Sequence, residues 1–521
     1  MKYNKLHRYF FLMMIAFLSL NSCTDLDERP YTFIDPDNFY KNETQLDQGL
    51  MGVYNRFRRM AGDYTYIMRI ECCTDFGQPC YTKEDCPQIN CWYDINNAST
   101  STFKNLWSRA YQVINSANTI LARGEGVDMD ETHKMQLFAQ ARFLRAYTYF
   151  ILVRIYGGVP IPTSYTKGLE GLKIPRETVE TVYEYVIDDL EYCEQNLPVK
   201  GTSDYDVWRA SKGAAQALLS EVYLTRASME GITDYYQMCV DYCERVIDSE
   251  VYDLVDNYKD LWFAFNAEAK NNQESIFELQ YAPISGQENV CHRQFGLGNS
   301  ITIPGFGSYF YHRFGPAIYA WQSYDTDDER LGVFITKYVM NDQLHEFVPE
   351  DKGFYPGSKN WLTSTPGNAK FYDFQTSANL MLPCANLYMM RYSEVLLNYA
   401  EAKNQLEGGS ADALEKLNQV RLRAGLPALG SMNQKDMDEA IFRERGWEFI
   451  GEAKLYYDEL RTNRLGYRVK NFVDKGIEEG MYLFQPLQFV PKKSFLWKIP
   501  QGDLDSNPAL VQNPDNISDQ L

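Results

Sequence analysis

Apolar residues recur at spacings of three and four over much of the chain, which is the period of helices buried along one face. The clearest stripe is formed by Leu137, Ala141, Leu144, Thr148, Ile151 and Ile155. Gly157, Gly158 and Pro160 follow this stripe. They predict the end of a helix, because glycine is favoured just past a helix C-terminus and proline cannot continue one.

The same period predicts helices on both sides of this segment. They cover residues 42–60, 104–123, 178–196, 209–228, 233–248, 388–407, 410–424 and 435–463. Several are adjacent pairs with small residues at the expected contact, such as Ala214, Ala215 and Ala217. Helix pairs that need neighbours to bury their faces are typical of tetratricopeptide-like hairpins, here without a strict repeat of about 34 residues. We therefore expect a mainly α fold.

Between about residues 250 and 385 the helical period fades. Glycine, proline, asparagine and aromatic residues dominate, as in FGLGNSITIPGFGSYFYHRFG and YPGSKNWLTSTPGNAKFYDF. This composition predicts long loops with short strands and helices. Long loops in a compact protein are usually functional or disordered, and the aromatic content argues against disorder. We expect one domain over residues 23–521, with helical parts at about 40–250 and 386–521 around this loop-rich part.

The first 22 residues have the pattern of a signal peptide. Three basic residues precede the apolar run 9–18, which is shorter than the roughly 20 residues of a membrane-spanning helix. The tetrapeptide LNSC that ends at Cys23 resembles a bacterial lipobox, and the acidic residues after it resemble a signal for export to the cell surface. We expect Cys23 to carry lipid; the alternative is an ordinary secretory signal with an incidental cysteine.

The formal net charge is −19, from 51 Lys and Arg against 70 Asp and Glu. This acidity argues against a nucleic-acid partner, which requires clustered basic residues. It also has the wrong sign for an anionic membrane surface, so a lipid anchor would have to hold the protein on the membrane. No segment after the signal is long and apolar enough to cross a bilayer.

Eleven cysteines are present, and assigning Cys23 to lipid leaves ten, an even number that an oxidising compartment can pair. Five of them crowd into one stretch, namely Cys72, Cys73, Cys80, Cys86 and Cys91. Their spacing is not that of a zinc site, and no histidine lies nearby. We prefer disulfides across this stretch over buried thiols, and the spacing does not determine the pairing.

Several segments, taken in order, resemble the SusD/RagB family of surface nutrient-binding lipoproteins of Bacteroidetes. They are WSRAYQVINSANTIL (107–121), AQARFLRAYTYFILVRIYGGVPI (139–161), PRETVETVYEYVIDDL (175–190), RASKGAAQALLSEVYL (209–224), MRYSEVLLNYAEAKNQL (390–406), LNQVRLRAGLP (417–427), RERGWEFIGEAKLYYDELR (443–461) and LWKIPQGDLDSNPALVQNPDN (496–516). One departure is that the family usually has Gly and Arg where this chain has Ala453 and Leu455.

The resemblance implies a tetratricopeptide-like helical scaffold with an irregular, ligand-facing region. It implies an outer-membrane, cell-surface location through the lipid anchor and a partner, a SusC-like TonB-dependent transporter. The implied function is capture of an oligosaccharide or polysaccharide for uptake, and the alternative is a RagB-like peptide receptor of the same build. Neither a cofactor nor a metal is expected.

The loop before the helix at 104–123 contains the strongest candidate ligand residues. Trp92 and Tyr93 can stack on the apolar face of a sugar ring, while Asn96 and Asn97 can bond its hydroxyl groups. Asp75 can reach the same place from the preceding turn. The alternative is that Trp92 packs locally and the asparagines form turns, which asparagine does readily.

The loop-rich part offers a second group of aromatic side chains. The ligand-binding candidates there are Tyr309, Tyr311, Trp321 and Trp361, and His312, Tyr324 and Tyr372 accompany them. For any single ring, packing in the core is the more common role. As a set, rings from two loops would form the extended surface that a long glycan requires, and we expect at least two of them to contact ligand.

No catalytic arrangement is visible in the sequence. Glu444, Glu448 and Glu452 recur every four residues, but glycosidases place their two carboxyl groups across a substrate cleft. With Arg443 and Arg445 beside them, solvated or interhelical salt bridges are the better interpretation. H-E-x-x-H, G-x-S-x-G and phosphate-binding glycine loops are absent from the sequence. We therefore expect a binding protein and no enzyme.

Overall fold

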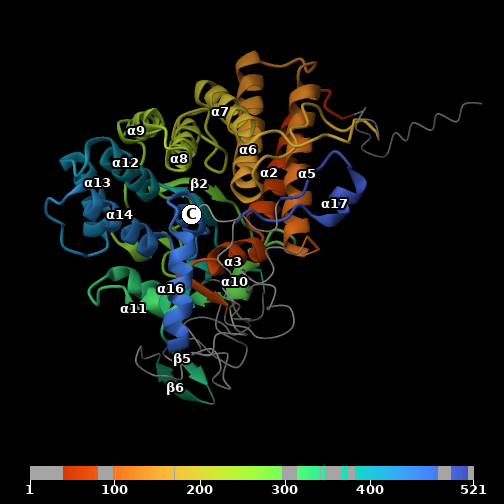
Figure 1. Ribbon diagram of the computed structural model, residues 1–521. Helices are drawn as coiled ribbons and strands as arrows, with labels where there is room; N and C mark the ends of the chain where they lie inside the picture. The colour runs from red at the N-terminus through yellow and green to blue at the C-terminus, as the bar shows by residue number, and fades with distance from the viewer. Residues whose placement is uncertain are drawn as a thin grey trace, which may run out of the picture.

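Helices arranged in an arc form the larger part of the molecule, and a loop-rich part lies below them (Figure 1). The computed structural model describes residues 39–79, 98–99, 101–168, 171–295, 314–340, 342–346, 366–373, 382–478 and 495–513. The arc consists of α2 (Glu43–Ala61), α5 (Ser101–Gly124), α6 (Glu131–Tyr156), α7 (Val179–Asn196), α8 (Lys212–Glu230), α9 (Thr233–Ile247), α12 (Tyr392–Glu407), α13 (Ala411–Arg423) and α14 (Gln434–Phe449). Neighbours along this series pack on one another. The mainly α, hairpin-based prediction is confirmed.

Side-chain caps begin many of these helices where the sequence supplies a short polar residue. The Ser211 side chain accepts a hydrogen bond from the Ala214 N–H at the start of α8, and Asp130 accepts from the His133 N–H at the start of α6. Such caps satisfy backbone groups that have no partner inside the helix. Gly157, with φ of 72°, ends α6 as predicted.

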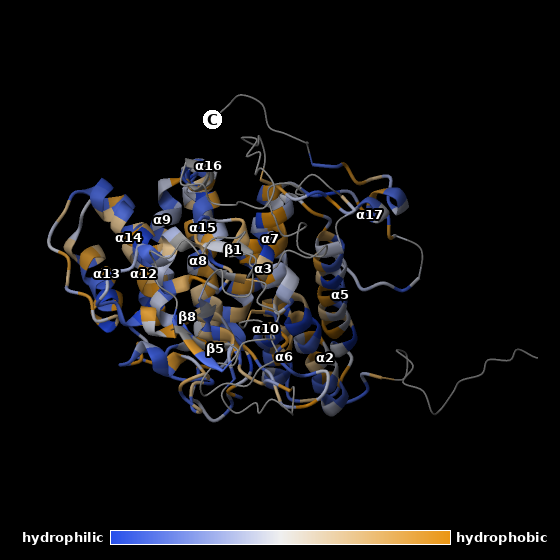
Figure 2. Cartoon of the chain, turned by 90° about the horizontal axis from the view of Figure 1, so that it is seen from below, coloured by the Kyte–Doolittle hydropathy of each residue, from blue (hydrophilic) through white to orange (hydrophobic). Residues whose placement is uncertain are grey.

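Helix α6 departs from the predicted pattern because it is buried on nearly every side. Its C-terminal half from Phe143 to Tyr156 is buried at every position, including Arg145 and Arg154. Both arginines are neutralised by acids, since Arg145 pairs with Asp189 at 2.8 Å and Arg154 pairs with Glu221 at 2.6 Å. The apolar stripe is therefore only part of the buried surface of this helix. By contrast, α2 and α5 alternate apolar and polar positions (Figure 2).

Two predicted helices have different boundaries. The segment 435–463 is not one helix but two, α14 and α15 (Leu455–Arg461), because Gly451 and Ala453 adopt φ values of 85° and 57°. These left-handed conformations interrupt any helix. The segment 388–407 begins as a strand, β8 (Leu387–Arg391), and becomes helical only at Tyr392. Further helices that we did not predict are α3 (Tyr64–Cys72), α16 (Leu465–Glu478) and α17 (Gln501–Ser506), whereas α10 (Cys291–Phe295) and α11 (Ile318–Gln322) are short helices of the loop-rich part.

The strands form four antiparallel pairs within the described residues. The pairs are β1–β3 (Gly77–Pro79 with Phe314–Pro316), β2–β8 (Ser275–Leu279 with Leu387–Arg391), β4–β7 (Phe334–Ile335 with Gly367–Asn368) and β5–β6 (Lys337–Met340 with Gln343–Glu346). Single-turn 3-10 helices at Tyr258–Leu261, Glu329–Val333 and Ala369–Phe371 complete the described part of the loop-rich region. This confirms the prediction of short strands and helices there.

A single large hydrophobic cluster runs from Leu46 on α2 to Ile499 near the C-terminal end. It joins residues of the helical arc with residues of the loop-rich part, such as Phe314 and Phe371. None of the helices in the described ranges is both long and apolar enough to span a membrane. The expected signal segment and Cys23 lie outside the described residues.

Five cysteines of the described chain are buried free thiols, namely Cys193, Cys239, Cys243, Cys291 and Cys384. These five cysteines therefore do not form the disulfides that an even number of cysteines would allow. Cys72 and Cys73 are buried at the end of α3. Cys80, Cys86 and Cys91 lie outside the described residues, so a disulfide among the crowded cysteines stays a prediction.

Candidate functional site

The loops that contain the candidate ligand residues join the described structure at one place. Strand β1 ends at Pro79, just before the first candidate loop, and strand β3 begins at Phe314, just after the second. Pro79 and Phe314 are opposite each other in the β1–β3 ladder. A further backbone bond from Ala317 N–H to Phe76 O, at 2.7 Å, extends this contact. The first loop therefore starts beside the end of the second loop.

Phenylalanine rings bring the start of the second loop and the segment 366–373 to the same place. The Phe295 ring, at the start of the second loop, lies 5.6 Å from the Phe314 ring and 4.6 Å from the Phe371 ring. Phe371 belongs to the short described segment 366–373, which directly follows the stretch with Trp361. Ring contacts at these distances are ordinary core packing. The ends of three separate chain segments thus meet around one small aromatic cluster.

Two of the nine candidate ligand residues lie in described segments, and they are Asp75 and Trp321. The other seven lie outside the described residues: Trp92, Tyr93, Asn96, Asn97, Tyr309, Tyr311 and Trp361. Asp75 is separated from β1 by Phe76 alone, and Trp321 lies on α11, which follows β3 after one residue. The structure therefore brings the segments of both described candidates to the point where the loops join.

Asp75 is held by an arginine from α16. The Arg468 Nη2 atom lies 2.9 Å from Asp75 Oδ2, and Arg468 Nε donates to Asp75 Oδ1 at 3.2 Å. The Arg468 guanidinium also lies over the Phe76 and Phe442 rings, at 5.3 and 4.8 Å. Burial lowers and the charge of Asp75 raises the pKa of Arg468, and the net direction is upward. Asp75 keeps a side-chain exposure of 20%, so part of its carboxylate remains accessible.

Trp321 is half-buried and packs against the main hydrophobic cluster, while its backbone N–H donates to Ala317 O at 3.0 Å. Two rings that accompany it in the sequence belong to the core. Tyr324 is buried and its hydroxyl donates to Trp447 O at 2.8 Å. Tyr372 is fully buried with its ring 5.4 Å from the His292 ring. Tyr324 and Tyr372 therefore cannot face a ligand.

Helix α16 adds side chains that sequence reasoning missed. The Phe472 ring lies 5.8 Å from the Tyr319 ring of α11, and Lys475 Nζ lies 3.9 Å above the same Tyr319 ring. Tyr467 of α16 is 49% exposed. The available signal was the apolar spacing of Leu465, Val469 and Phe472, which has a helical period. Figure 1 shows α16 running along α11 toward the β5–β6 hairpin.

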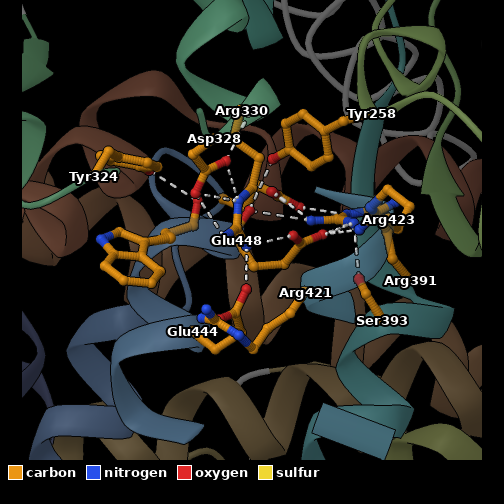
Figure 3. A network of polar contacts seen from close by, with 12 residues as sticks. Tyr258, Tyr324, Asp328, Arg330, Arg391, Ser393, Arg421, Arg423, Glu444 and Glu448 are labelled. Carbon is orange, nitrogen blue, oxygen red and sulfur yellow. Dashed lines mark hydrogen bonds and ion pairs between the residues drawn. The ribbon is translucent and has the colours of Figure 1, made fainter. Parts of the chain in front are cut away.

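The three glutamates that could suggest a glycosidase lie in a buried ion network, and Figure 3 shows Glu444 and Glu448 within it. Glu448 is fully buried and its carboxylate contacts Arg391 at 2.8 Å, Arg330 at 3.2 Å and Arg423. Five cations meet five acids in this network, and they are Arg330, Arg391, Arg421, Arg423 and Lys370 with Glu274, Asp328, Glu444, Glu448 and Glu452. The prediction of interhelical ion pairs is confirmed, but the alternative prediction that these acids are solvated is wrong.

The predicted partners of these glutamates were also wrong. Arg445 pairs with Asp458 at 2.9 Å, and Arg443 lies 6.0 Å from the Trp447 ring. Burial raises the pKa of Glu448, but Arg423, Arg391 and Arg330 together lower it further, and the net shift is strongly downward. A glutamate fixed in its charged form by three arginines, without exposure to a cleft, has no means of transferring a proton to a substrate.

A cavity of about 60 Å³ lies deeper in the molecule, between α3, α6, β8 and the turn 450–454. Its polar lining residues are paired with one another or with neighbours: Tyr66 with Tyr457 at 2.7 Å, Lys370 with Glu452 at 2.7 Å and Lys454 with Glu394 at 2.9 Å. A volume of this size holds a few water molecules. Neither Asp75 nor Trp321 lines it, so it is separate from the candidate ligand site.

No group of three or more histidine, cysteine, aspartate or glutamate side chains suited to a metal ion occurs in the part of the chain that the structure describes. Within the described residues, the candidate site contains the Asp75 carboxylate, held by Arg468, and half-buried aromatic rings such as Trp321, where three chain segments meet. Such side chains suit a ligand with both hydroxyl groups and apolar faces.

Comparisons with known proteins give the same picture. Residues 355–515 match the model of the SusD family, and residues 26–224 match a family described as starch-binding and associating with the outer membrane. A SusD-like protein P2 from Formosa agariphila is 27% identical, with 97% of this chain and 99% of the relative covered.

Solved structures are also similar over nearly the whole chain. A SusD homolog from Bacteroides thetaiotaomicron has a TM-score of 0.78 at 23% identity and covers 93% of this chain and 99% of its own. A laminarin-binding SusD-like protein has a TM-score of 0.70 at 25% identity and covers 91% of this chain and 100% of its own. The chain belongs to the SusD/RagB family, whose members bind their ligands without catalysis.

Proposed function

We propose that this protein is a cell-surface lipoprotein that captures an oligosaccharide or polysaccharide and delivers it to a SusC-like TonB-dependent transporter. The observation that carries the proposal is the convergence at β1–β3 of the loops that contain Trp92, Tyr93, Tyr309 and Tyr311. A glycan needs rings for its apolar faces and polar groups for its rim, and these loops supply both. Individual contacts would be shallow, so affinity would come from several sugar units together.

Relatives support the choice of glycan over peptide. One structure of this fold is described as laminarin-binding, and a matching family is described as starch-binding. Laminarin and starch are therefore the first probes for this chain, followed by a wider glycan array. Binding of mixed peptides, with none of any glycan, would favour a RagB-like receptor instead.

The binding experiment uses purified residues 24–521 and titrates each glycan while Trp fluorescence is recorded. We expect Trp92→Ala to abolish the fluorescence change and Trp321→Ala to weaken binding by about 5- to 150-fold, which corresponds to about 1–3 kcal/mol per stacked ring (a scale taken from base–aromatic stacking). The matched control is Trp208→Ala, because Trp208 is also half-buried but packs beside Tyr54 on the helical part, with ring centroids 5.9 Å apart. Equal loss in the control would count against a site at the loops.

The anchor and the partner need separate tests. Mass spectrometry of the mature N-terminus should find acylated Cys23, and Cys23→Ala should release the protein from the membrane fraction. Co-purification from the native membrane should recover a TonB-dependent barrel. We also propose that residues 23–521 form one folding unit, since one hydrophobic cluster joins the helical and loop-rich parts, and a single thermal transition would support this.

A further inference from the structure

Glu459 is a buried acid that the binding proposal does not use. It lies on α15 and is fully buried. Neither of its carboxyl oxygens accepts a hydrogen bond from any N–H or O–H group of the described residues. Arg468 Nε is 3.8 Å from Glu459 Oε1, which is too long for a hydrogen bond. A buried carboxylate without donors costs several kcal/mol, so the charged form is disfavoured here.

Asp75 is the carboxylate that shares the Arg468 guanidinium with Glu459, since Arg468 Nε lies 3.2 Å from Asp75 Oδ1 and 3.8 Å from Glu459 Oε1. Asp75 already accepts from Arg468 on both of its oxygens, at 2.9 and 3.2 Å. Two ionised carboxylates beside one guanidinium repel each other and offer only acceptors, so a proton on one of them is favoured. Because the Arg468 donors are directed at Asp75, the proton belongs on Glu459.

The other charges around this pair do not change that assignment. Asp458, the neighbour on α15, is directed at Arg445 and Arg461 and adds further negative potential. Arg468 on α16 opposes the effect only partly, at its longer distance. Burial first, and then the charge of Asp75, raise the pKa of Glu459 well above its ordinary value.

We infer that Glu459 is a neutral carboxylic acid at neutral pH that donates its proton to Asp75, and so acts as a positioning residue for that carboxylate at the edge of the ligand-facing loops. The Arg468 guanidinium and the Glu459 O–H then hold the Asp75 carboxylate together. Asp75 precedes β1, so fixing it also fixes the start of the loop that carries Trp92. The contribution of Glu459 to ligand capture rests on the proposed function, whereas the protonation of Glu459 does not depend on it.

The test compares the full mature chain with Glu459→Gln, which keeps the shape and an N–H donor but cannot ionise. Infrared difference spectra at neutral pH should show the C=O band of a carboxylic acid in the unchanged protein and its loss in the variant. Denaturant unfolding across pH is the second readout. The folded protein retains a proton that the unfolded chain releases, so its stability falls as pH rises above the ordinary pKa of glutamate.

For each pH unit between the ordinary and the raised pKa, the unfolding equilibrium constants of the two proteins should separate by about tenfold, with the variant the more stable. The control is Glu415→Gln, an acid with 63% side-chain exposure, which should run parallel to the unchanged protein. Parallel curves for Glu459→Gln, with no lost band, would overturn the inference.

The positioning role has its own readout. Glu459→Met has a similar length but no donor, so amide hydrogen exchange of residues 74–79 should be faster in Glu459→Met than in Glu459→Gln. Equal exchange rates would refute the positioning role. The outcomes also separate the two proposals, because a protein that shows the band but binds no glycan contradicts only the proposed function. A protein that binds glycan without the band contradicts only the shared proton.

Discussion

Removing the charge of Glu448 is the sharpest test of the buried ion network. Glu448→Gln keeps the shape of the side chain but leaves Arg330, Arg391 and Arg423 without a shared counter-charge, and all three are buried. Breaking a buried pair by neutralising one partner costs about 3–5 kcal/mol, because the remaining charge stays desolvated. Against a total stability of about 5–15 kcal/mol, that loss is large.

The acids that remain in the variant place the expected loss at the lower end of this range. Arg391 and Arg423 both keep a contact with Glu274 at 2.6 Å, and Arg330 keeps Asp328 at 2.8 Å. No arginine is therefore left wholly unpaired. The expected loss for Glu448→Gln is about 3 kcal/mol, measured as a lower urea midpoint at unchanged slope.

The pH dependence of the stability loss and a control variant follow from the same contacts. The folded-state pKa of Glu448 is depressed, so its stabilising contribution is present above the ordinary value of 4.5 and is lost only as pH falls far below it. The deficit of the variant should therefore stay constant from neutral pH down to about that value. Glu415→Gln breaks an exposed pair with Lys416 at 3.2 Å and should cost at most about 1 kcal/mol. A Glu448→Gln loss no larger than this control would refute the argument.

Two further predictions concern a strained turn and a buried histidine. Ala453→Gly should raise the free energy of unfolding by about 0.5–1 kcal/mol in urea titrations, because φ at this residue is 57° and only glycine adopts that region without strain; a loss of stability would contradict it. Burial lowers the pKa of His292 from 6.5 to about 4, so neutral His292 contributes stability above pH 6.5 that is lost as pH falls toward 4. His292→Gln should therefore gain on the unchanged protein across that window, by up to about 3 kcal/mol, and a constant difference would exclude this cause.

The helical arc could be predicted because its signals are local. Period, polar caps and stop residues such as Gly157 act within one or two turns of chain. The end of α14 could not be predicted in this way, because Ile450 and Ala453 keep a helical spacing of apolar residues while the backbone there turns to meet distant partners. Glu71 of α3 accepts the Gly451 N–H at 3.0 Å. A contact across 380 residues leaves no trace in the local pattern.

The candidate site shows the same division. The kind of residue at the site, aromatic and polar in long loops, is visible in the sequence. Partner choice is not visible, since Asp75 binds Arg468 from a helix that we did not predict, at a separation of 393 residues. Tyr324 and Tyr372 look like accessible loop rings in the sequence but are core residues in the structure. Aromatic residues serve both purposes, and only the tertiary environment separates them.

The meeting of Pro79 with Phe314 in a three-rung ladder has a consequence for how such proteins diversify. The segment 80–97 begins at this short seam and the segment 296–313 ends at it. Under the proposed function, exchanging either segment would change what the protein recognises. The ring contacts of Phe314 with the main hydrophobic cluster must survive such an exchange, because they join the seam to the helices.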